Sequence, residues 1–368
     1  MAILIFIIIL SVLVLIHEFG HFIVAKRNGI GVEEFGLGLP PRAWGKKVGE
    51  TIYSINWLPF GGFVKLVGED PTDIKREQEN SFYIKKVGQR AQVIVAGVFM
   101  NLILGVVIFY IVLFAMGFKF SLLKLSDHKF KFVEQSTQVL VASINENSPA
   151  QKTGIEAGEL IISIDGQAID SIDKLQQVIR ANEGKPLEIV LEDSVNNSTR
   201  TVISVPEFNE ELGAPALGIG LGETVALNYK TLNQKFLSGF THSYNMVDYS
   251  IGIFGKLIGA AISEKDISAV SDNVSGPIGI AAITSQVVSF GAISILQFVG
   301  VLSLNLAIVN ILPFPALDGG RFAFIIYEAV TKRRVHAGFE KWINTIGFAI
   351  LIGLILLVTY SDILKLIK

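Results

Sequence analysis

The feature that most constrains this chain is a pair of histidines at the end of a long apolar run. His17-Glu18-Phe19-Gly20-His21 reads H-E-x-x-H and follows an almost unbroken series of apolar residues from Ala2. On a helix, His17 and His21 lie one turn apart on one face, so both imidazoles can bind one zinc ion, with Glu18 beside it as a general base. Ionisable residues at membrane depth are costly, and they indicate a functional site.

The composition excludes several classes of protein. Of the 368 residues, 51% are hydrophobic and only 17% are charged, and the mean hydropathy is +0.53. This is too apolar for an ordinary soluble protein. The net charge of -2 gives no reason to expect a nucleic-acid partner. Because the chain has no cysteine, disulfides, thiolate metal ligands and cysteine nucleophiles are excluded.

Four segments are long and apolar enough to cross a lipid bilayer, which takes about 20 residues. We therefore predict an α-helical polytopic membrane protein with four transmembrane helices. The first segment lacks the basic flank and the cleavage site of a signal peptide, so we expect it to be retained. The predicted spans are residues 2–25, 91–118, 293–314 and 342–360.

Basic residues predict the orientation of these spans. Lysine and arginine are concentrated in the stretches 26–90 and 321–341, which join the first span to the second and the third to the fourth. By the positive-inside rule both stretches are cytoplasmic. We therefore expect a multi-pass protein of the cell's inner (cytoplasmic) membrane, with both termini and the long 119–290 region on the extracytoplasmic side.

A segment of the first loop, 51–67, is too apolar to be a plain solvated linker. It is rich in β-branched and aromatic residues around Gly61-Gly62, which predicts a β-hairpin on the cytoplasmic side within the 1–118 region. Two interpretations remain open: a hairpin packed on the membrane surface, or an edge that accepts an extended substrate strand. The candidate substrate-binding residues are Ile55, Asn56, Gly61, Gly62 and Phe63.

Residues 139–207 read as one inserted soluble α/β module. Four strand-like stretches alternate with two helical ones, and Ser148-Pro149 is typical of a helix start. The following region, 208–290, is predicted to hold extracytoplasmic amphipathic helices over 237–262. These lie either on the outer face of the membrane or against the soluble module. Residues 291–368 hold the last two spans.

A catalytic zinc site needs a third protein ligand and an open position for water. The candidate is Asp318, in the run from Asn310 to Arg321, where Pro313 and Pro315 must interrupt a helix. A broken helix at membrane depth is tolerated where it is buried in protein or lines a cavity. Alternatively, Asp318 caps a helix or pairs with Arg321; the H-E-x-x-H favours the role of ligand.

Asn101 is a polar residue inside the second apolar run. Its amide could bind a substrate carbonyl and stabilise an oxyanion, or could form a hydrogen bond that holds helices together. The remaining histidines, His128, His242 and His336, lack partner spacing, and we expect each to be an ordinary surface residue.

With these motifs placed, most of the chain resembles the site-2 protease family of intramembrane zinc metalloproteases, and within it the bacterial regulator-of-sigma-E protease subgroup. The resemblance rests on H-E-F-G-H in the first span, N-x-x-P-x-x-x-L-D-G at 310–319 and S-G-P-I-G-I at 275–280. The module at 139–207, with its S-P-A-Q-K-T-G and I-I-S-I-D-G stretches, resembles a bacterial PDZ domain.

The resemblance implies that His17, His21 and Asp318 bind zinc, with Glu18 as the base and Asn101 as an assisting residue. It also implies that the 51–67 hairpin is a membrane re-entrant β-loop that guides the substrate. There are two departures. Val98 stands where the family usually has proline, which predicts a straighter helix, and the chain has room for one PDZ domain instead of two.

The expected function is that of an intramembrane zinc metalloendopeptidase in regulated intramembrane proteolysis. Its expected partners are the lipid bilayer and single-span membrane proteins already trimmed outside the membrane, such as anti-sigma factors or remnant signal peptides. The PDZ domain either binds peptide or acts as a size filter. The alternative is a catalytically inactive PDZ-containing membrane scaffold, which leaves the H-E-x-x-H and Asp318 unexplained. A transporter would show polar positions repeated in two halves, and no such symmetry is found.

Overall fold

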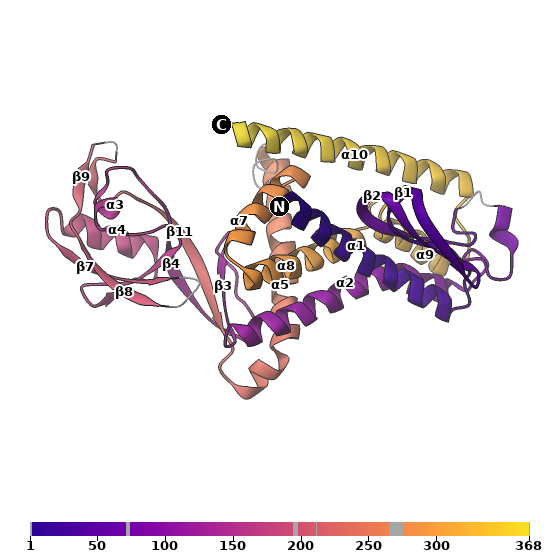
Figure 1. Ribbon diagram of the computed structural model, residues 1–368, viewed down its shortest axis with the longest axis horizontal. Helices are drawn as coiled ribbons and strands as arrows, with labels where there is room; N and C mark the ends of the chain where they lie inside the picture. The colour runs from indigo at the N-terminus through magenta and orange to yellow at the C-terminus, as the bar shows by residue number, and fades with distance from the viewer. Residues whose placement is uncertain (1, 71–73, 194–197, 211, 265–274, 368) are drawn as a thin grey trace. The chain divides into compact units, whose positions relative to one another are not determined.

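The structure is a computed structural model that describes residues 2–70, 74–193, 198–210, 212–264 and 275–367 (Figure 1). The chain forms two compact units. The helical unit contains residues 1–112 and 242–368, and the β unit contains residues 113–241.

Four helices of the described chain are long and apolar enough to cross a membrane, as predicted. The polypeptide is therefore a multi-pass membrane protein. The predicted spans were placed correctly to within a few residues, except that the last helix extends further at both ends. α2 runs unbroken through Val98, as the absence of a proline there predicts. The four helices are α1 (Ala2–Arg27), α2 (Val87–Ala115), α8 (Ala292–Ile311) and α10 (Ala337–Ile367).

Among the described residues, three further α-helices and one short 3₁₀ helix, η1 (Ile74–Glu77), accompany these spans. α9 (Asp318–Thr331) follows the proline-containing break after α8. α7 (Pro277–Ser289) is short and apolar and packs against α1, α8 and α10. The side chain of Asp362 in α10 accepts a hydrogen bond of 2.8 Å from the backbone N–H of Gly279, so a carboxylate binds in the first turn of α7.

α5 (Leu232–Glu264) is a single long helix where one or two amphipathic helices were predicted over 237–262. His242 on this helix is fully buried, with its ring 4.6 Å from that of Phe109 in α2. The prediction of a surface histidine is therefore wrong. The residues next to His242 in the sequence are polar, so no sequence pattern indicated that this face of α5 packs on α2. Burial holds the pKa of His242 far below its ordinary value, at about 3, so the ring is neutral.

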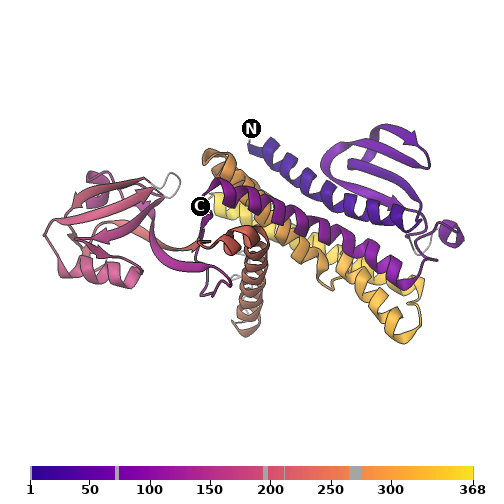
Figure 2. The ribbon, with the colours of Figure 1, turned by 90° about the horizontal axis from the view of Figure 1, so that it is seen from below.

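The sheet of the helical unit differs from the predicted hairpin. It is built from β1 (Val32–Val48) and β2 (Thr51–Leu66), whose connecting turn lies at residues 49–50. Residues 34–37 of β1 pair with 62–65 on one side and with 52–55 on the other. The two halves of 51–67, which were predicted to pair with each other around Gly61-Gly62, are thus separated by β1. Both Figures 1 and 2 show this sheet beside α1.

The β unit is a mixed α/β module with a larger extent than predicted. Its main sheet has the strand order β3-β11-β4-β5-β7-β8, with β6 (Gln167–Ala168) beside β5. The six strands of this order are β3 (Lys119–Leu123), β11 (Ile219–Asn228), β4 (Glu134–Ile144), β5 (Glu159–Ile164), β7 (Leu187–Asp193) and β8 (Thr199–Ser204). The four predicted strands and both predicted helices, α3 (Pro149–Lys152) and α4 (Ile172–Ala181), are present. The Ser148 side chain caps α3, as its position before Pro149 predicts.

Two strands outside 139–207 belong to the same sheet, which is why the predicted bounds were too narrow. β3 (Lys119–Leu123) and β11 (Ile219–Asn228) pair with each other, and β11 also pairs with β4. Positions 194–197 of the predicted module, and 211 and 265–274 of the following region, lie outside the described residues. The other strands are β4 (Glu134–Ile144), β5 (Glu159–Ile164), β7 (Leu187–Asp193), β8 (Thr199–Ser204), β9 (Glu207–Asn209) and β10 (Ala214–Ala216).

Candidate metal centre

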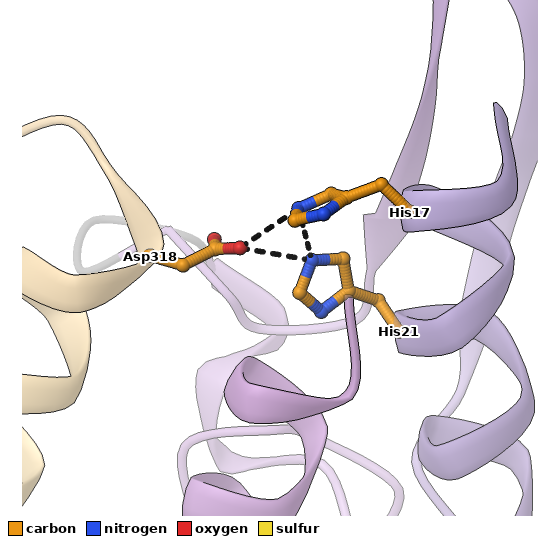
Figure 3. Close-up of side chains that lie close together, drawn as sticks. All are labelled: His17, His21 and Asp318. Atoms are coloured by element: carbon orange, nitrogen blue, oxygen red, sulfur yellow. Dashed lines mark hydrogen bonds and ion pairs between the residues drawn. The ribbon is translucent and has the colours of Figure 1, made fainter. Parts of the chain in front are cut away.

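Three side chains from the two ends of the chain converge in the helical unit. His17 and His21 project from successive turns of α1, and Asp318 points at both of them from the start of α9 (Figure 3). The Nε2 atoms of His17 and His21 are 3.2 Å apart, and Oδ2 of Asp318 lies 2.9 Å and 3.2 Å from them. Both histidines are buried. The predicted ligand set is thus brought together.

The glycine of α2 beside the imidazoles explains how they can sit so close to a neighbouring backbone. A Cβ atom built on Gly97 would collide with Nε2 of His21 and lie 2.7 Å from Nε2 of His17. Any larger residue would force both rings out of place. Gly97 therefore lets the backbone of α2 pass directly beside the ligand atoms.

The break between α8 and α9 places Asp318. α8 ends at Ile311, and α9 starts at Asp318 itself, so the carboxylate lies in the first turn, where the helix dipole favours negative charge. A Cβ atom on Gly319 would collide with the backbone oxygen atoms of Ile311 and Leu312. The start of α9 thus packs directly on the end of α8, and this fixes the carboxylate at the depth of the two histidines.

Hydrogen bonds on the far side of each ring determine which nitrogen faces the centre. Nδ1 of His21 lies 2.7 Å from the backbone oxygen of Val93. A proton on this Nδ1 is donated to the carbonyl and leaves the lone pair of Nε2 directed at the centre. Asn101 is fully buried, and its amide lies 3.3 Å from Nδ1 of His17.

The amide of Asn101 also bears on whether the centre fits a metal ion. In the described contact its Nδ2 faces Nδ1 of His17, and its buried Oδ1 has no hydrogen-bond partner among the described residues. Rotating the amide by half a turn lets Oδ1 accept a proton from Nδ1, which frees Nε2 of His17 for a metal. After this rotation, Oδ1 of Asn101 has a hydrogen-bond donor. Both histidines then carry their proton on Nδ1 and leave Nε2 free to bind a metal ion.

The spacing of the three atoms fits zinc. Bonds of about 2.0–2.1 Å in a tetrahedral zinc site separate neighbouring ligand atoms by roughly 3.3 Å. The three atoms lie 2.9–3.2 Å apart. At such distances their lone pairs repel one another, so a proton or a cation must lie between them. Two imidazoles, one carboxylate and a fourth position make up the donor set of a catalytic zinc site.

Glu18 and the sheet border the same cavity. A cavity of about 260 Å³ is lined by the metal-site residues His21 and Asp318, by Glu18, and by Phe63 and Val64 of β2. The backbone N–H of Val64 donates a 3.2 Å hydrogen bond to Oε2 of Glu18. The general base predicted from the sequence therefore lies between the predicted metal ligands and a strand.

The other predicted substrate-binding residues are divided between the two sides of β1. Gly62 and Phe63 lie in the half of β2 that borders the cavity, next to Gly61, whose φ is +70°. Ile55 and Asn56 lie in the other half and do not line the cavity. Asn56 instead donates a hydrogen bond of 3.0 Å to the backbone oxygen of Gly38, within the sheet.

Asn310 at the end of α8 is a site residue that the sequence analysis did not single out. Its Nδ2 lies 3.5 Å from Nε2 of His17, on the side of the ring that faces the metal centre. The signal that could have found it was its place at the start of the N-x-x-P-x-x-x-L-D-G motif.

Glu328 of α9 forms an ion pair with Arg90 of α2, which holds the two helices together. Nη2 of Arg90 lies 2.6 Å from Oε1 of Glu328, and Arg334 binds the same carboxylate at 3.0 Å. Burial alone would raise the pKa of Glu328, but the hydrogen bonds and positive charges of Arg90 and Arg334 together more than offset it, so this pKa lies below its ordinary value. The carboxylate therefore stays ionised and continues to hold the two helices together.

Comparison with known proteins agrees with this centre. A Clostridium perfringens protein, named provisionally as a zinc metalloprotease, is 36% identical over 354 residues that cover 96% of each chain. The regulator of sigma-W protease RasP of Bacillus subtilis is 28% identical over 98% of each chain. A solved PDZ domain of a Listeria monocytogenes SdrC-like protein is 26% identical over 23% of this chain and 85% of that one, with a TM-score of 0.21. The model of peptidase family M50 matches residues 5–354, and the chain therefore belongs to that family.

Proposed function

We propose that the chain is a zinc endopeptidase that cleaves single-span membrane proteins within or near the bilayer. The observation that carries the proposal is the convergence of His17, His21 and Asp318 on one point between helices long enough to cross a membrane. These three residues would hold the ion. When bound, zinc supplies a Lewis acid that polarises a carbonyl and lowers the pKa of water to about 7.

The chain's own residues perform the remaining steps. Glu18 takes the proton of the attacking water on a carboxylate oxygen and delivers it to the nitrogen of the leaving amine. Asn310 donates from Nδ2 to the oxygen of the scissile carbonyl, where negative charge develops. Asn101, behind His17, orients that ring instead of contacting the substrate, which replaces the predicted contact with the oxyanion.

The sheet edge holds the substrate extended. A helical substrate hides its carbonyls in its own hydrogen bonds, so it must unwind before it can be cleaved. In the part of the chain that the structure describes, residues 62–66 pair with β1 on one side and with no strand on the other, and the cavity that holds the proposed metal ligands lies along them. An unwound segment added to this edge would lie along the metal centre. The 32–66 sheet thus takes the role predicted for a re-entrant 51–67 hairpin.

The β unit selects substrates outside the membrane. Its order of strands and helices is that predicted for a PDZ domain, and such domains bind chain ends or extended segments. The B. subtilis relative is named as a regulator of sigma-W. By analogy, the substrates are membrane-anchored anti-sigma factors that another protease has already shortened, with remnant signal peptides as a second group. The termini and the β unit then face the extracytoplasmic side.

The test combines cleavage with metal analysis. Replacement of the base, Glu18→Gln, keeps the size and the acceptor atom of the side chain but removes its basicity. We expect kcat for a purified single-span substrate to fall by about 10²–10⁴-fold, with about one zinc ion per chain retained.

Two controls separate the possible outcomes. Asp318→Asn should lose both zinc and cleavage, because an amide is a poor zinc ligand. Unchanged cleavage by the Glu18→Gln enzyme would dismiss the mechanism. A wild-type chain that binds no zinc after incubation with the ion would instead support the inactive scaffold.

A further inference from the structure

The open edge of the β1/β2 sheet is occupied by two carboxylates of the chain itself. Among the described residues, no strand pairs with the outer side of 62–66. The N–H of Val64 is donated to Oε2 of Glu18 at 3.2 Å, and the N–H of Leu66 to Oε2 of Glu69 at 3.4 Å. Two outward donors, two residues apart, thus each bind a carboxylate.

Both carboxylates lie at the metal-site cavity. Glu18, Glu69, Val64 and Leu66 all line the cavity of about 260 Å³ that Asp318 also lines. Glu69 in addition forms an ion pair with Arg321, one turn after Asp318 on α9. A strand added to this edge would need the same two N–H groups, because successive outward groups on an edge strand are two residues apart.

We propose that Glu18 and Glu69 guard this edge, and that pairing of an extended substrate segment displaces both of them. Two carbonyl oxygens of the substrate, two residues apart, replace the carboxylates on Val64 and Leu66. Glu69 then stays with Arg321, and Glu18 is released toward the metal centre. The inference rests on the proposed function and adds a coupling: the base becomes available only when a strand is in place.

The arrangement has a second physical advantage. An unpaired strand edge beside a cavity is a site for unwanted pairing, and natural proteins protect such edges with charged groups. Carboxylates accept hydrogen bonds strongly but cannot continue a ladder. The guard therefore admits a partner that offers at least two correctly spaced carbonyls, which an extended backbone does and a helical one does not.

The resting state can be tested without catalysis. In the full chain labelled with ¹⁵N-valine and ¹⁵N-leucine in detergent micelles, the Val64 amide signal is assigned by its loss in Val64→Ile. We expect Glu18→Gln to move the Val64 amide proton upfield, because a neutral acceptor replaces a charged one. Glu69→Gln should move the amide of Leu66 and leave that of Val64 in place. If neither amide moves, the guard does not exist, whether or not the chain is a protease.

The second experiment compares the two partners of one ion pair by their cleavage kinetics. Glu69→Ala frees the N–H of Leu66 for the substrate, so KM should fall about tenfold, or roughly 1.4 kcal/mol, with kcat unchanged. Arg321→Ala removes the same ion pair but leaves Glu69 on the edge, so KM should not fall. Equal changes in KM for both variants would mean that the Glu69–Arg321 pair only anchors the segment after β2 to α9, and would overturn the proposal.

The two experiments distinguish failure of the guard from failure of the proposed function. A chain without any cleavage activity, but with the expected amide shifts, would retain the guarded edge and lose the proteolytic assignment. Normal cleavage without amide shifts would retain the protease and dismiss the guard.

Discussion

The two units of this protein differ in which side chains they expose and in the polar groups buried beside their apolar cores. The core of the β unit is apolar, with Val141, Ile164, Leu175 and Ile189 at its centre. In the helical unit, large apolar side chains such as Leu356 point outward, and buried apolar residues such as Leu13 and Phe109 share the interior with buried polar ones. These buried polar residues are His17, His21, Asn101, His242, Asn245, Ser303 and Asp362. The solvent explains the difference. Water drives apolar side chains inward, whereas lipid gives no such force, and close packing and hydrogen bonds hold the helices together.

The difference predicts which kind of substitution each unit cannot tolerate. In the β unit, loss of apolar volume should reduce stability. In the helical unit, loss of a small residue or of a polar contact should reduce metal binding before it reduces stability. Four substitutions, from the largest expected effect to the smallest, sharpen or break this comparison.

The largest effect is expected in the β core. Ile189 on β7 is fully buried, so Ile189→Ala should lower the local stability of the β unit by about 2–5 kcal/mol. The measurement is hydrogen exchange of the β5 and β7 amides in the full chain. The exposed Ile203→Ala on β8 serves as control, with a change within about 0.5 kcal/mol. A loss of zinc in Ile189→Ala would contradict the separation of the two units.

Gly97→Ala tests the close approach of α2 to the ligands. Its Cβ atom must displace the rings of His17 and His21, and overpacking of this kind costs about 1–3 kcal/mol. We expect zinc affinity to fall by about 5–150-fold, with the helical content unchanged by circular dichroism.

A matched control for this variant lies on the same helix. A Cβ atom on Gly88 meets no atom within 4 Å, so Gly88→Ala should keep full zinc affinity. If both alanine variants weaken zinc binding equally, the cause is the helix as a whole and not the approach of Gly97 to the histidines.

Asn101→Ala removes the amide behind His17. Loss of a hydrogen-bond partner behind a metal ligand typically weakens metal binding by about 10–100-fold, and a competition titration with a zinc chelator measures it. Asn305→Ala on α8 is the control amide and should leave the affinity unchanged. Full zinc affinity combined with a reduced kcat in Asn101→Ala would restore the predicted role at the oxyanion.

The smallest effect concerns the Glu328 ion pairs. Because the pKa of Glu328 lies below its ordinary value of 4.5, these pairs stabilise the protein above that value and lose their effect as the pH falls below it. Glu328→Gln should therefore lower Tm at neutral pH, and the Tm difference from the wild type should shrink toward about pH 4. A difference that stays constant with pH would show that the pairs do not contribute through charge.

Much of the metal centre was predictable, because local patterns carry its chemistry. The i, i+4 spacing of His17 and His21 indicates a shared ligand face, and the prolines before Asp318 indicate a break that exposes a carboxylate. The spans and four strands of the β unit (β4, β5, β7 and β8) were predictable for the same reason, since length and periodicity are local properties; β3 and β11, which join the same sheet from outside 139–207, were not predicted.

The pairing of β1 with β2 in the sheet beside the metal centre could not be predicted from the sequence. The stretch 32–48 carries Gly36, Gly38, Pro40 and Pro41, which disfavour strands. It becomes a strand through pairing with β2, which lies on both sides of residues 34–37 and also pairs with residues 42–48. The burial of His242 likewise depends on contact with Phe109, which is distant in the sequence. The edge contacts of Glu18 and Glu69 depend on the placement of β2, so no sequence pattern marks them.

His17 and Asp318 are separated by 301 positions along the chain. During synthesis, the first helix enters the bilayer long before the ribosome reaches the aspartate. A nascent or prematurely terminated polypeptide therefore carries two imidazoles without their carboxylate, and it cannot hydrolyse its neighbours. With the proposed ligand set, hydrolysis can begin only after Asp318 has been translated, so the late position of this residue keeps shorter nascent chains inactive.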